Sequence, residues 1–337
     1  MENQIIISVI VPCYNLQDYI DRCIYSLKKQ TINNIEFIFV NDGSTDETLT
    51  KLSIFEKQDD RVVIINKDNA GVSEARNDGI KIARGEYLLF LDGDDFINYN
   101  ACEKMYALVE KNREMLLIFN YSLYENGIFK RVYNHGIPEG SYNLQEFLET
   151  VKILPISYKL YRRDIIVKNE IYFDPKIKYG EVFTFFLNYL YYCNTICVSN
   201  CSFYNYIIRN GSAIHSLNYE NEINIVTTIT QIDNYANRLI GLKNKYCYHK
   251  AVFQLVKVLI LVKYISLGLD YAKAKKSFCR IYSHPLMINT TRFIMTKDNW
   301  LSQDKYLSIL LIFSLKIAYI TCTIMYKYKR LINKNKS

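Results

Sequence analysis

Short apolar runs alternate with longer amphipathic segments along the first hundred residues of the chain. The apolar runs have the length and unbroken hydrophobicity of strands buried on both faces of a parallel sheet. They lie at residues 5–11, 36–40, 62–65 and 87–91. The segments between them carry apolar side chains at helical spacing, and they lie at residues 18–30, 45–57 and 73–84. This alternation predicts an α/β fold, a parallel sheet with helices on both faces.

Each of the four apolar runs is followed by a short polar loop. These loops are Pro12–Asn15, Asp42–Ser44, Asp68–Gly71 and Asp92–Asp95. In an open parallel sheet, ligands bind outside the carboxyl ends of the strands, so the loops are expected to converge on one rim. Asp and Gly are also ordinary turn residues, and an Asp-rich turn is the alternative for the last loop. The convergence of all four loops favours a binding site.

Three carboxylates, Asp92, Asp94 and Asp95, follow the fourth apolar run at close range. Folding tolerates such a cluster only if a cation or hydrogen-bond donors stabilise it. The chain has neither the glycine-rich dinucleotide fingerprint after its first strand nor a P-loop, so a bound nucleotide needs another partner for its phosphates. Mg²⁺ and Mn²⁺ bridge acidic side chains and diphosphate oxygens. The cluster therefore predicts a divalent metal cofactor, Mn²⁺ or Mg²⁺.

Four segments coincide with these strands and loops. They read ISVIVPCYN at residues 7–15, FVNDGSTD at 39–46, NAGVSEARN at 69–77 and GEYLLFLDGDD at 85–95. In this order they resemble family 2 glycosyltransferases, densely up to about residue 100 and more weakly to about residue 215. The resemblance implies a GT-A, Rossmann-like fold. It also implies a metal-dependent glycosyltransferase of the hexosyltransferase type, which transfers a sugar from a UDP-linked donor with inversion at the anomeric carbon.

The same resemblance assigns donor-binding roles to residues on these loops. It implies that Pro12 and Tyr14 line the pocket for the base and that Asp42 accepts a hydrogen bond from the uracil ring. It further implies that Asn69 and Arg76 help to hold the nucleotide. These residues are the donor-binding candidates on the first three loops and on the helix that follows.

The segment that begins at Asp92 matches the DXD motif of the family. By this resemblance, Asp92 contacts the ribose side of the donor and Asp94 binds the metal. Residues 204–215 resemble a loop that closes over the diphosphate in the family. On that loop Arg209 and Ser212 are donor types suited to phosphate oxygens.

The chain departs from the family pattern at the residue expected to act as the base. Similar proteins carry a Gly-Glu-Asp segment whose Asp takes the acceptor proton, but here Glu181 is followed by Val182, which cannot take a proton. Such a base contributes roughly 10²- to 10⁴-fold in rate. Three interpretations stay open: Glu181 is the catalytic base, another carboxylate such as Asp174 substitutes, or activity has been lost.

The resemblance also sets the expected domain organisation. Residues 1–215 are expected to form the GT-A domain, with the nucleotide-sugar half over about 1–100 and the acceptor half over about 101–215. Residues 216–337 are expected to form a C-terminal, mainly helical extension. They show no catalytic motif.

Residues 306–325 form an apolar segment of about one bilayer span, with Lys316 near its middle. A basic tail follows at residues 327–336. A helix lying on the membrane surface, with the tail on anionic headgroups, fits this pattern better than a spanning helix. Packing on the transferase domain is the other alternative. The pattern predicts a peripheral membrane contact, which would suit a lipid-linked glycan acceptor.

Composition narrows the class and the location. Of the 337 residues, 50% are hydrophobic and 23% charged, which excludes wholesale disorder. The nine cysteines form no CxxC pair and no N-terminal signal is evident, so a cytoplasmic location is expected, at the inner face of the membrane if the tail binds there. The net charge of +8 lies partly in the tail, and no nucleic-acid-binding motif occurs, so no nucleic-acid partner is expected.

Together these patterns predict transfer of a sugar to a glycan or lipid-linked glycan acceptor in the synthesis of a surface polysaccharide or lipopolysaccharide. A non-catalytic nucleotide-sugar or glycan-binding subunit is the first alternative, because Val182 replaces the expected base. Another metal-dependent nucleotidyl enzyme is the second, and it would share the fold but not the four motifs.

Overall fold

The chain divides into two compact units in the computed structural model. The first unit comprises Met1–Thr150, Pro155–Pro175 and Glu181–Arg209, and the second comprises Val151–Leu154, Lys176–Gly180 and Asn210–Ser337. The structure describes residues 4–151, 154, 158–178, 180–208, 222–239, 242, 246–260 and 281–297. The predicted boundary after residue 215 lies outside the described residues.

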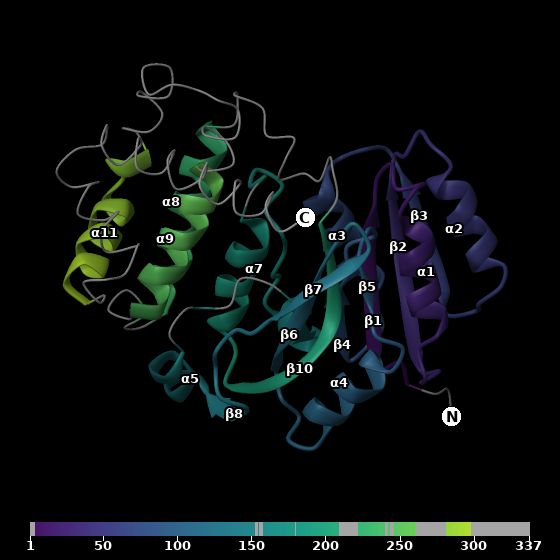
Figure 1. Ribbon diagram of the computed structural model, residues 1–337, viewed down its shortest axis with the longest axis horizontal. Helices are drawn as coiled ribbons and strands as arrows, with labels where there is room; N and C mark the ends of the chain where they lie inside the picture. The colour runs from purple at the N-terminus through teal and green to yellow at the C-terminus, as the bar shows by residue number, and fades with distance from the viewer. Residues whose placement is uncertain are drawn as a thin grey trace. The chain divides into compact units, whose positions relative to one another are not determined.

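The first four strands form the parallel half of the sheet in the first unit (Figure 1). They are β1 (Ile7–Cys13), β2 (Ile35–Asp42), β3 (Val62–Lys67) and β4 (Tyr87–Phe90). Their order is β3-β2-β1-β4, and each neighbouring pair is parallel. Every residue of β1 and β2 is buried, as expected for strands covered on both faces. The predicted parallel sheet is confirmed.

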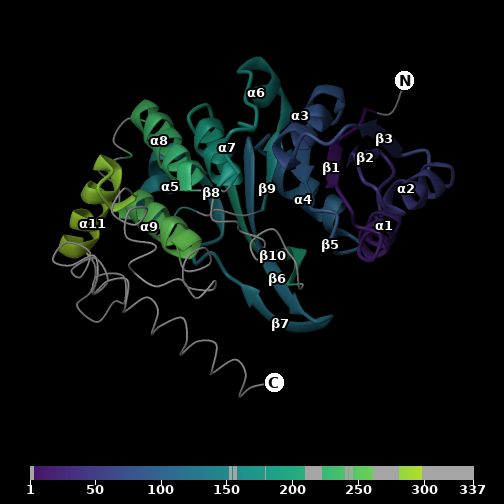
Figure 2. The ribbon, with the colours of Figure 1, turned by 90° about the horizontal axis from the view of Figure 1, so that it is seen from above.

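Three helices connect these strands. They are α1 (Ile20–Lys28), α2 (Thr48–Glu56) and α3 (Val72–Ile82). Figure 2 shows α3 on one face of this sheet and α1 and α2 on the other. Helix α3 lies very close to β1, because a Cβ atom added at Gly79 would fall 2.4 Å from Cγ2 of Ile10. Glycine therefore permits the close packing that brings α3 over the middle of the sheet.

Beyond β4 the sheet continues in mixed directions, a detail that the sequence did not predict. The added strands are β5 (Phe96–Ile97), β6 (Leu116–Glu125), β7 (Ile128–Tyr133), β8 (Gly140–Asn143), β9 (Lys159–Arg162) and β10 (Thr195–Ile208). Strand β9 is antiparallel to β4 and to β6, whereas β10 is parallel to β6. Strand β7 pairs with β6, and β8 with β10, outside the main strand order.

Four helices accompany this second half of the sheet. They are α4 (Ala101–Glu110), α5 (Leu144–Thr150), α6 (Arg163–Lys168) and α7 (Glu181–Leu190). An aromatic cluster fixes α7 on β4 and β9, because the ring of Phe185 lies 5.6 Å from that of Phe90 and 5.3 Å from that of Tyr161. The Phe173 ring stacks on the Phe185 ring, with the two ring centres 4.1 Å apart. The cluster places Glu181, the first residue of α7, near the end of β4.

The described part of the second unit is helical. It contains α8 (Glu222–Arg238), α9 (Tyr246–Ile260) and α11 (Pro285–Lys297), which pack on one another. A buried hydrogen bond of 2.9 Å joins His249 Nδ1 on α9 to Thr290 Oγ1 on α11. Among the residues described, no helix is both long and apolar enough to cross a bilayer. The predicted surface helix at 306–325 and the basic tail lie outside the described residues.

Candidate functional site

The loops after β1 and β2 are tied together at the rim of the sheet. The side-chain oxygen of Asn15 accepts a hydrogen bond of 2.9 Å from the backbone N–H of Thr45, and Ser44 Oγ accepts one of 3.1 Å from the backbone N–H of Asn15. Pro12 is buried in β1, whereas Tyr14 is 51% exposed just beyond it. The rim therefore presents the ring of Tyr14 to solvent, where a planar base could stack on it.

Asp42 holds the loop after β2 against the loop that precedes α3. Its buried carboxylate accepts hydrogen bonds from the backbone N–H groups of Ala70 at 2.9 Å and Gly71 at 2.7 Å. The Asn69 side chain donates to the backbone carbonyl of Asp42 at 2.8 Å. Gly43 has φ +71°, and a Cβ there would meet the backbone nitrogen of Asn69 at 2.6 Å. This loop-holding role was not predicted, and the contact of Asp42 with uracil stays a prediction.

The DXD loop is fastened to β10 through Tyr204. The Tyr204 hydroxyl donates to Asp95 Oδ2 at 2.7 Å and accepts a hydrogen bond of 3.1 Å from the backbone N–H of Asp92. Asp95 Oδ1 accepts a further bond of 2.8 Å from the backbone N–H of Ile207. Burial, followed by the charges of Asp92 and Asp94, raises the pKa of the Asp95 carboxyl well above its ordinary value. Asp95 thus supports the loop from within, while Asp94 is only partly buried.

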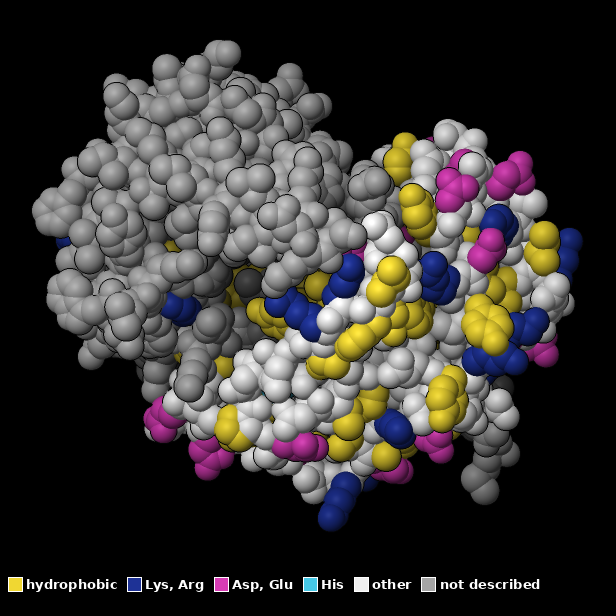
Figure 3. Space-filling model, viewed as in Figure 1, with side chains coloured by type: hydrophobic (Ala, Val, Ile, Leu, Met, Phe, Trp, Pro, Cys, Tyr) yellow, Lys and Arg dark blue, Asp and Glu magenta, His cyan; other side chains and the backbone are white. Residues whose placement is uncertain are grey.

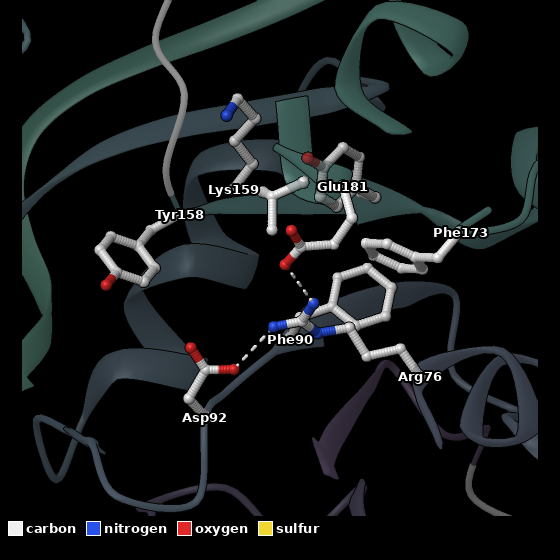
Figure 4. Close-up of a pocket in the computed structure, with 9 residues that line it drawn as sticks. Arg76, Phe90, Asp92, Tyr158, Lys159, Phe173 and Glu181 are labelled. Carbon is white, nitrogen blue, oxygen red and sulfur yellow. Dashed lines mark hydrogen bonds and ion pairs between the residues drawn. The ribbon is translucent and has the colours of Figure 1, made fainter. Parts of the chain in front are cut away.

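Arg76 joins the donor-side loop to the candidate base (Figure 4). Its guanidinium donates to Asp92 Oδ1 at 2.8 Å and to Glu181 Oε1 at 3.0 Å, and it lies 5.2 Å from the centre of the Phe173 ring. The Arg76 side chain is only 7% exposed. Burial alone would lower its pKa, but Asp92 and Glu181 outweigh burial and raise it. The pairing of residues 105 positions apart was not predicted.

These residues line a cavity of about 200 Å³ in the first unit. Its walls consist of four aromatic residues, two carboxylates, two cations and one valine: Phe90, Tyr158, Tyr161, Phe173, Asp92, Glu181, Arg76, Lys159 and Val182. Figure 4 shows Tyr158 and Asp92 on one side of the cavity and Glu181 and Phe173 on the other. A cavity with an apolar wall and a few convergent charged groups is typical of a small-molecule site.

Lys159 also lines the cavity, a position that was not predicted. It is 2% exposed, and its Nζ lies 4.2 Å from the centre of the Phe186 ring. Burial lowers the pKa of the Lys159 ammonium from 10.5 to about 7. The Lys-Leu-Tyr segment that starts β9 could have drawn attention to it, but nothing in the sequence shows that it would line the same cavity as Glu181.

The structure brings some predicted site residues together and leaves others untested. Asp92, Arg76 and Glu181 meet at one cavity, and Val182 lines it as well. The described residues contain no group of three or more His, Cys, Asp or Glu side chains arranged to hold a metal. Arg209 and Ser212 lie outside the described residues. The metal site at Asp94 and the phosphate contacts of that loop stay predictions.

Comparisons with known proteins agree with this architecture. The sequence model of glycosyl transferase family 2 matches residues 8–169. The glycosyltransferase EpsJ of Bacillus subtilis is 35% identical over 185 residues, which are 52% of this chain and 53% of that protein. The glycosyltransferase GlyG of Streptococcus pneumoniae is 31% identical over 230 residues, 63% of this chain and 73% of that protein. The match thus spans about half the length of EpsJ and 73% of the length of GlyG.

Among solved structures, residues 1–349 of TarS from S. aureus superpose with a TM-score of 0.69 at 20% identity, over 96% of this chain and 92% of that one. A likeness at this identity shows a shared fold. The mostly parallel sheet, the helices on both faces and the rim site therefore define a GT-A fold. The chain belongs to glycosyl transferase family 2.

Proposed function

We propose that the protein transfers a sugar from a UDP-linked donor to a glycan acceptor during synthesis of a surface polysaccharide. The observation that carries this proposal is the Asp92–Arg76–Glu181 bridge, which puts the donor-side carboxylate and the candidate base in one cavity. Structures of TarS contain UDP and UDP-GlcNAc. A further relative, 30% identical over 63% of this chain, is the poly(ribitol-phosphate) beta-glucosyltransferase of Bacillus spizizenii, and the match covers 34% of that protein.

Glu181 is the base that this proposal favours, and its use implies inversion at the anomeric carbon. It lies at the first turn of α7 and lines the cavity, and its Oε1 is held by Arg76. That contact fixes the carboxylate at the wall, and the proposal assigns its other oxygen, Oε2, to the acceptor hydroxyl. A base must reach the proton it removes, directly or through one water, so this fixed position supports the role. Asp174 is the alternative base, and it is partly buried close to the cavity wall formed by Phe173.

A divalent cation, Mn²⁺ or Mg²⁺, fits the carboxylates of the DXD loop. Both oxygens of Asp95 accept hydrogen bonds from the protein, and Asp92 is paired with Arg76. Asp94, which matches the metal-binding position of the DXD motif and is partly buried, is the carboxylate that would hold the ion, and Mg²⁺ in phosphate sites commonly takes one or two carboxylates together with substrate oxygens. When bound, the ion would stabilise negative charge on the leaving diphosphate.

A non-catalytic nucleotide-sugar-binding subunit is the second candidate. It is favoured by Val182, which lines the cavity at the position where the family carries its usual base. In that case Arg76 and Glu181 would form a structural pair that closes the cavity wall. The two candidates share donor binding and differ in turnover.

Donor binding and turnover together test the proposal. UDP with Mn²⁺ is expected to raise the midpoint of thermal unfolding, since a ligand at 100 times its Kd adds about 2.7 kcal/mol of stability. ADP at the same concentration serves as the matched control and should stabilise less. Equal stabilisation by ADP and UDP, or none by either, would refute a UDP-linked donor. Stabilisation by UDP-sugars without release of UDP, with water or any glycan present, would instead establish the binding subunit.

A further inference from the structure

Five tyrosines form a continuous row from the cavity to the β6–β7 hairpin. We call Tyr158, Tyr204, Tyr206, Tyr121 and Tyr133 the tyrosine row. Tyr158 stacks on Tyr204 with ring centres 3.7 Å apart and meets Tyr121 edge to face at 4.9 Å. Tyr121 stacks on Tyr133 at 4.9 Å, and Tyr206 lies 6.4 Å from Tyr121. Residues of β10, β6 and β7, and the residue that precedes β9, thus share one aromatic surface.

The row becomes more exposed with distance from the sheet core. Tyr204 is fully buried, Tyr158, Tyr121 and Tyr206 are partly buried, and Tyr133 is 48% exposed on β7. All residues of β7 are exposed. Figure 3 shows hydrophobic side chains beside Lys and Arg on the face that carries β7. Only the outer end of the row, at Tyr133, is exposed, and together with the other exposed side chains of β7 it forms an apolar patch of the kind that marks an interaction site.

Charge beside the row points to the kind of occupant. In the β6–β7 register, Tyr121 pairs with Tyr133 and Leu123 pairs with Arg131, so Arg131 lies on the same face as Tyr133. Its exposed guanidinium suits phosphate or carboxylate groups. Tyrosine rings offer a flat apolar face with a hydroxyl at the rim. These features match a sugar ring, which has an apolar C–H face surrounded by hydroxyls.

We infer that the tyrosine row binds the acceptor as an acidic glycan chain of pyranose rings and directs its end to Tyr158 at the cavity. The inference rests on the proposed function and adds the substrate class of the acceptor. Continuity carries it: the inner end of the row lines the cavity, and Tyr204, beneath Tyr158, holds both Asp92 and Asp95 of the donor loop. The row therefore connects the acceptor path to the loop expected to hold the donor.

Retention on an array of acidic and neutral bacterial surface glycans tests the inference, using the full chain. The wild type is expected to bind the acidic glycans of the array. Tyr133→Ala should weaken this binding by about fivefold or more, the scale of one aromatic stack. Tyr133→Phe should keep most of it. Tyr25→Ala is the matched control, because Tyr25 is 64% exposed on α1, outside the row, and its loss should change nothing.

Binding of UDP, measured on the same samples, separates this inference from the proposed function. UDP binding tests whether the donor is UDP-linked, and glycan binding on the array tests whether the tyrosine row binds the acceptor. The inference is overturned if the wild type binds no glycan on the array or binds neutral glycans alone. It is also overturned if Tyr133→Ala binds the acidic glycans as tightly as the wild type does. If Tyr133 instead mediates binding to a lipid surface or to a second copy of the chain, and no glycan binds, the inference is overturned as well.

Discussion

Glu181→Gln tests the assignment of the base most directly. The substitution keeps the shape of the side chain, and the amide oxygen can still accept the hydrogen bond from Arg76. The contact changes from an ion pair at 3.0 Å to a bond with a neutral acceptor, with side chains 7% and 16% exposed. The Arg76 guanidinium stays charged and keeps a hydrogen bond to the amide oxygen, but it loses the attraction of the Glu181 charge. Stability should therefore fall by about 1 to 2 kcal/mol, less than the roughly 3 to 5 kcal/mol that breaking a buried ion pair outright costs.

Loss of the base has a larger effect on catalysis. General base catalysis contributes roughly 10²- to 10⁴-fold, so Glu181→Gln should raise the barrier to transfer by about 3 to 5 kcal/mol while UDP-sugar affinity changes little. Release of UDP in the presence of acceptor measures kcat, and urea unfolding measures stability. Glu170→Gln is the matched control, because Glu170 is exposed and does not line the cavity. An unchanged kcat in Glu181→Gln, with a large loss in Asp174→Asn, would refute the assignment.

Three further predictions concern the metal, the buried lysine and the donor loop. Asp94→Asn should lower transfer by about 10²-fold or more and remove the Mn²⁺ dependence of UDP binding, whereas Asp60→Asn, in an exposed turn, should change neither. Between pH 7 and 10.5, unfolded chains bind more protons at Lys159 than the native state does, so wild-type stability should rise with pH there. Lys159→Met should stabilise the protein at pH 6 and flatten that rise in urea titrations, and an unchanged pH slope would contradict the burial argument. Tyr204→Phe should lower the free energy of unfolding by about 1 to 3 kcal/mol, since the Asp95 carboxylate loses a buried donor; an unchanged urea midpoint would show that this bond contributes nothing.

The first half of the fold was predictable because its signals are local. Each buried strand is a continuous apolar run, and each connection fits a helix of ordinary length, so β1 to β4 and α1 to α3 follow from periodicity and chain order. The rim position of the Asp92 loop follows from the same order. The directions of β9 and β6 were not predictable, since short strands in the second half pair with partners far along the chain.

Of the candidate site, the sequence indicated the loop that carries Asp92 but not the contacts that form the cavity. Glu181 could be named from its place in a family pattern, but its pairing with Arg76 depends on how α7 packs on β4 and β9 through aromatic rings. Asp95 was expected to support the neighbouring metal site, but its burial against Tyr204 was not predicted. Contacts of this kind span about a hundred residues and leave no periodic signal in the sequence.

We expect the Arg76 bridge to make donor and acceptor binding interdependent. Asp92 and Glu181 share one buried guanidinium, so a ligand that draws Asp92 toward the donor changes the field at Glu181. By thermodynamic reciprocity, an acceptor that contacts Glu181 changes UDP affinity by the same factor that UDP changes acceptor affinity. Isothermal titration of UDP with and without a bound glycan should show this coupling in the wild type. Arg76→Met should abolish it, and identical UDP affinities in the wild type under both conditions would show that the bridge is structural.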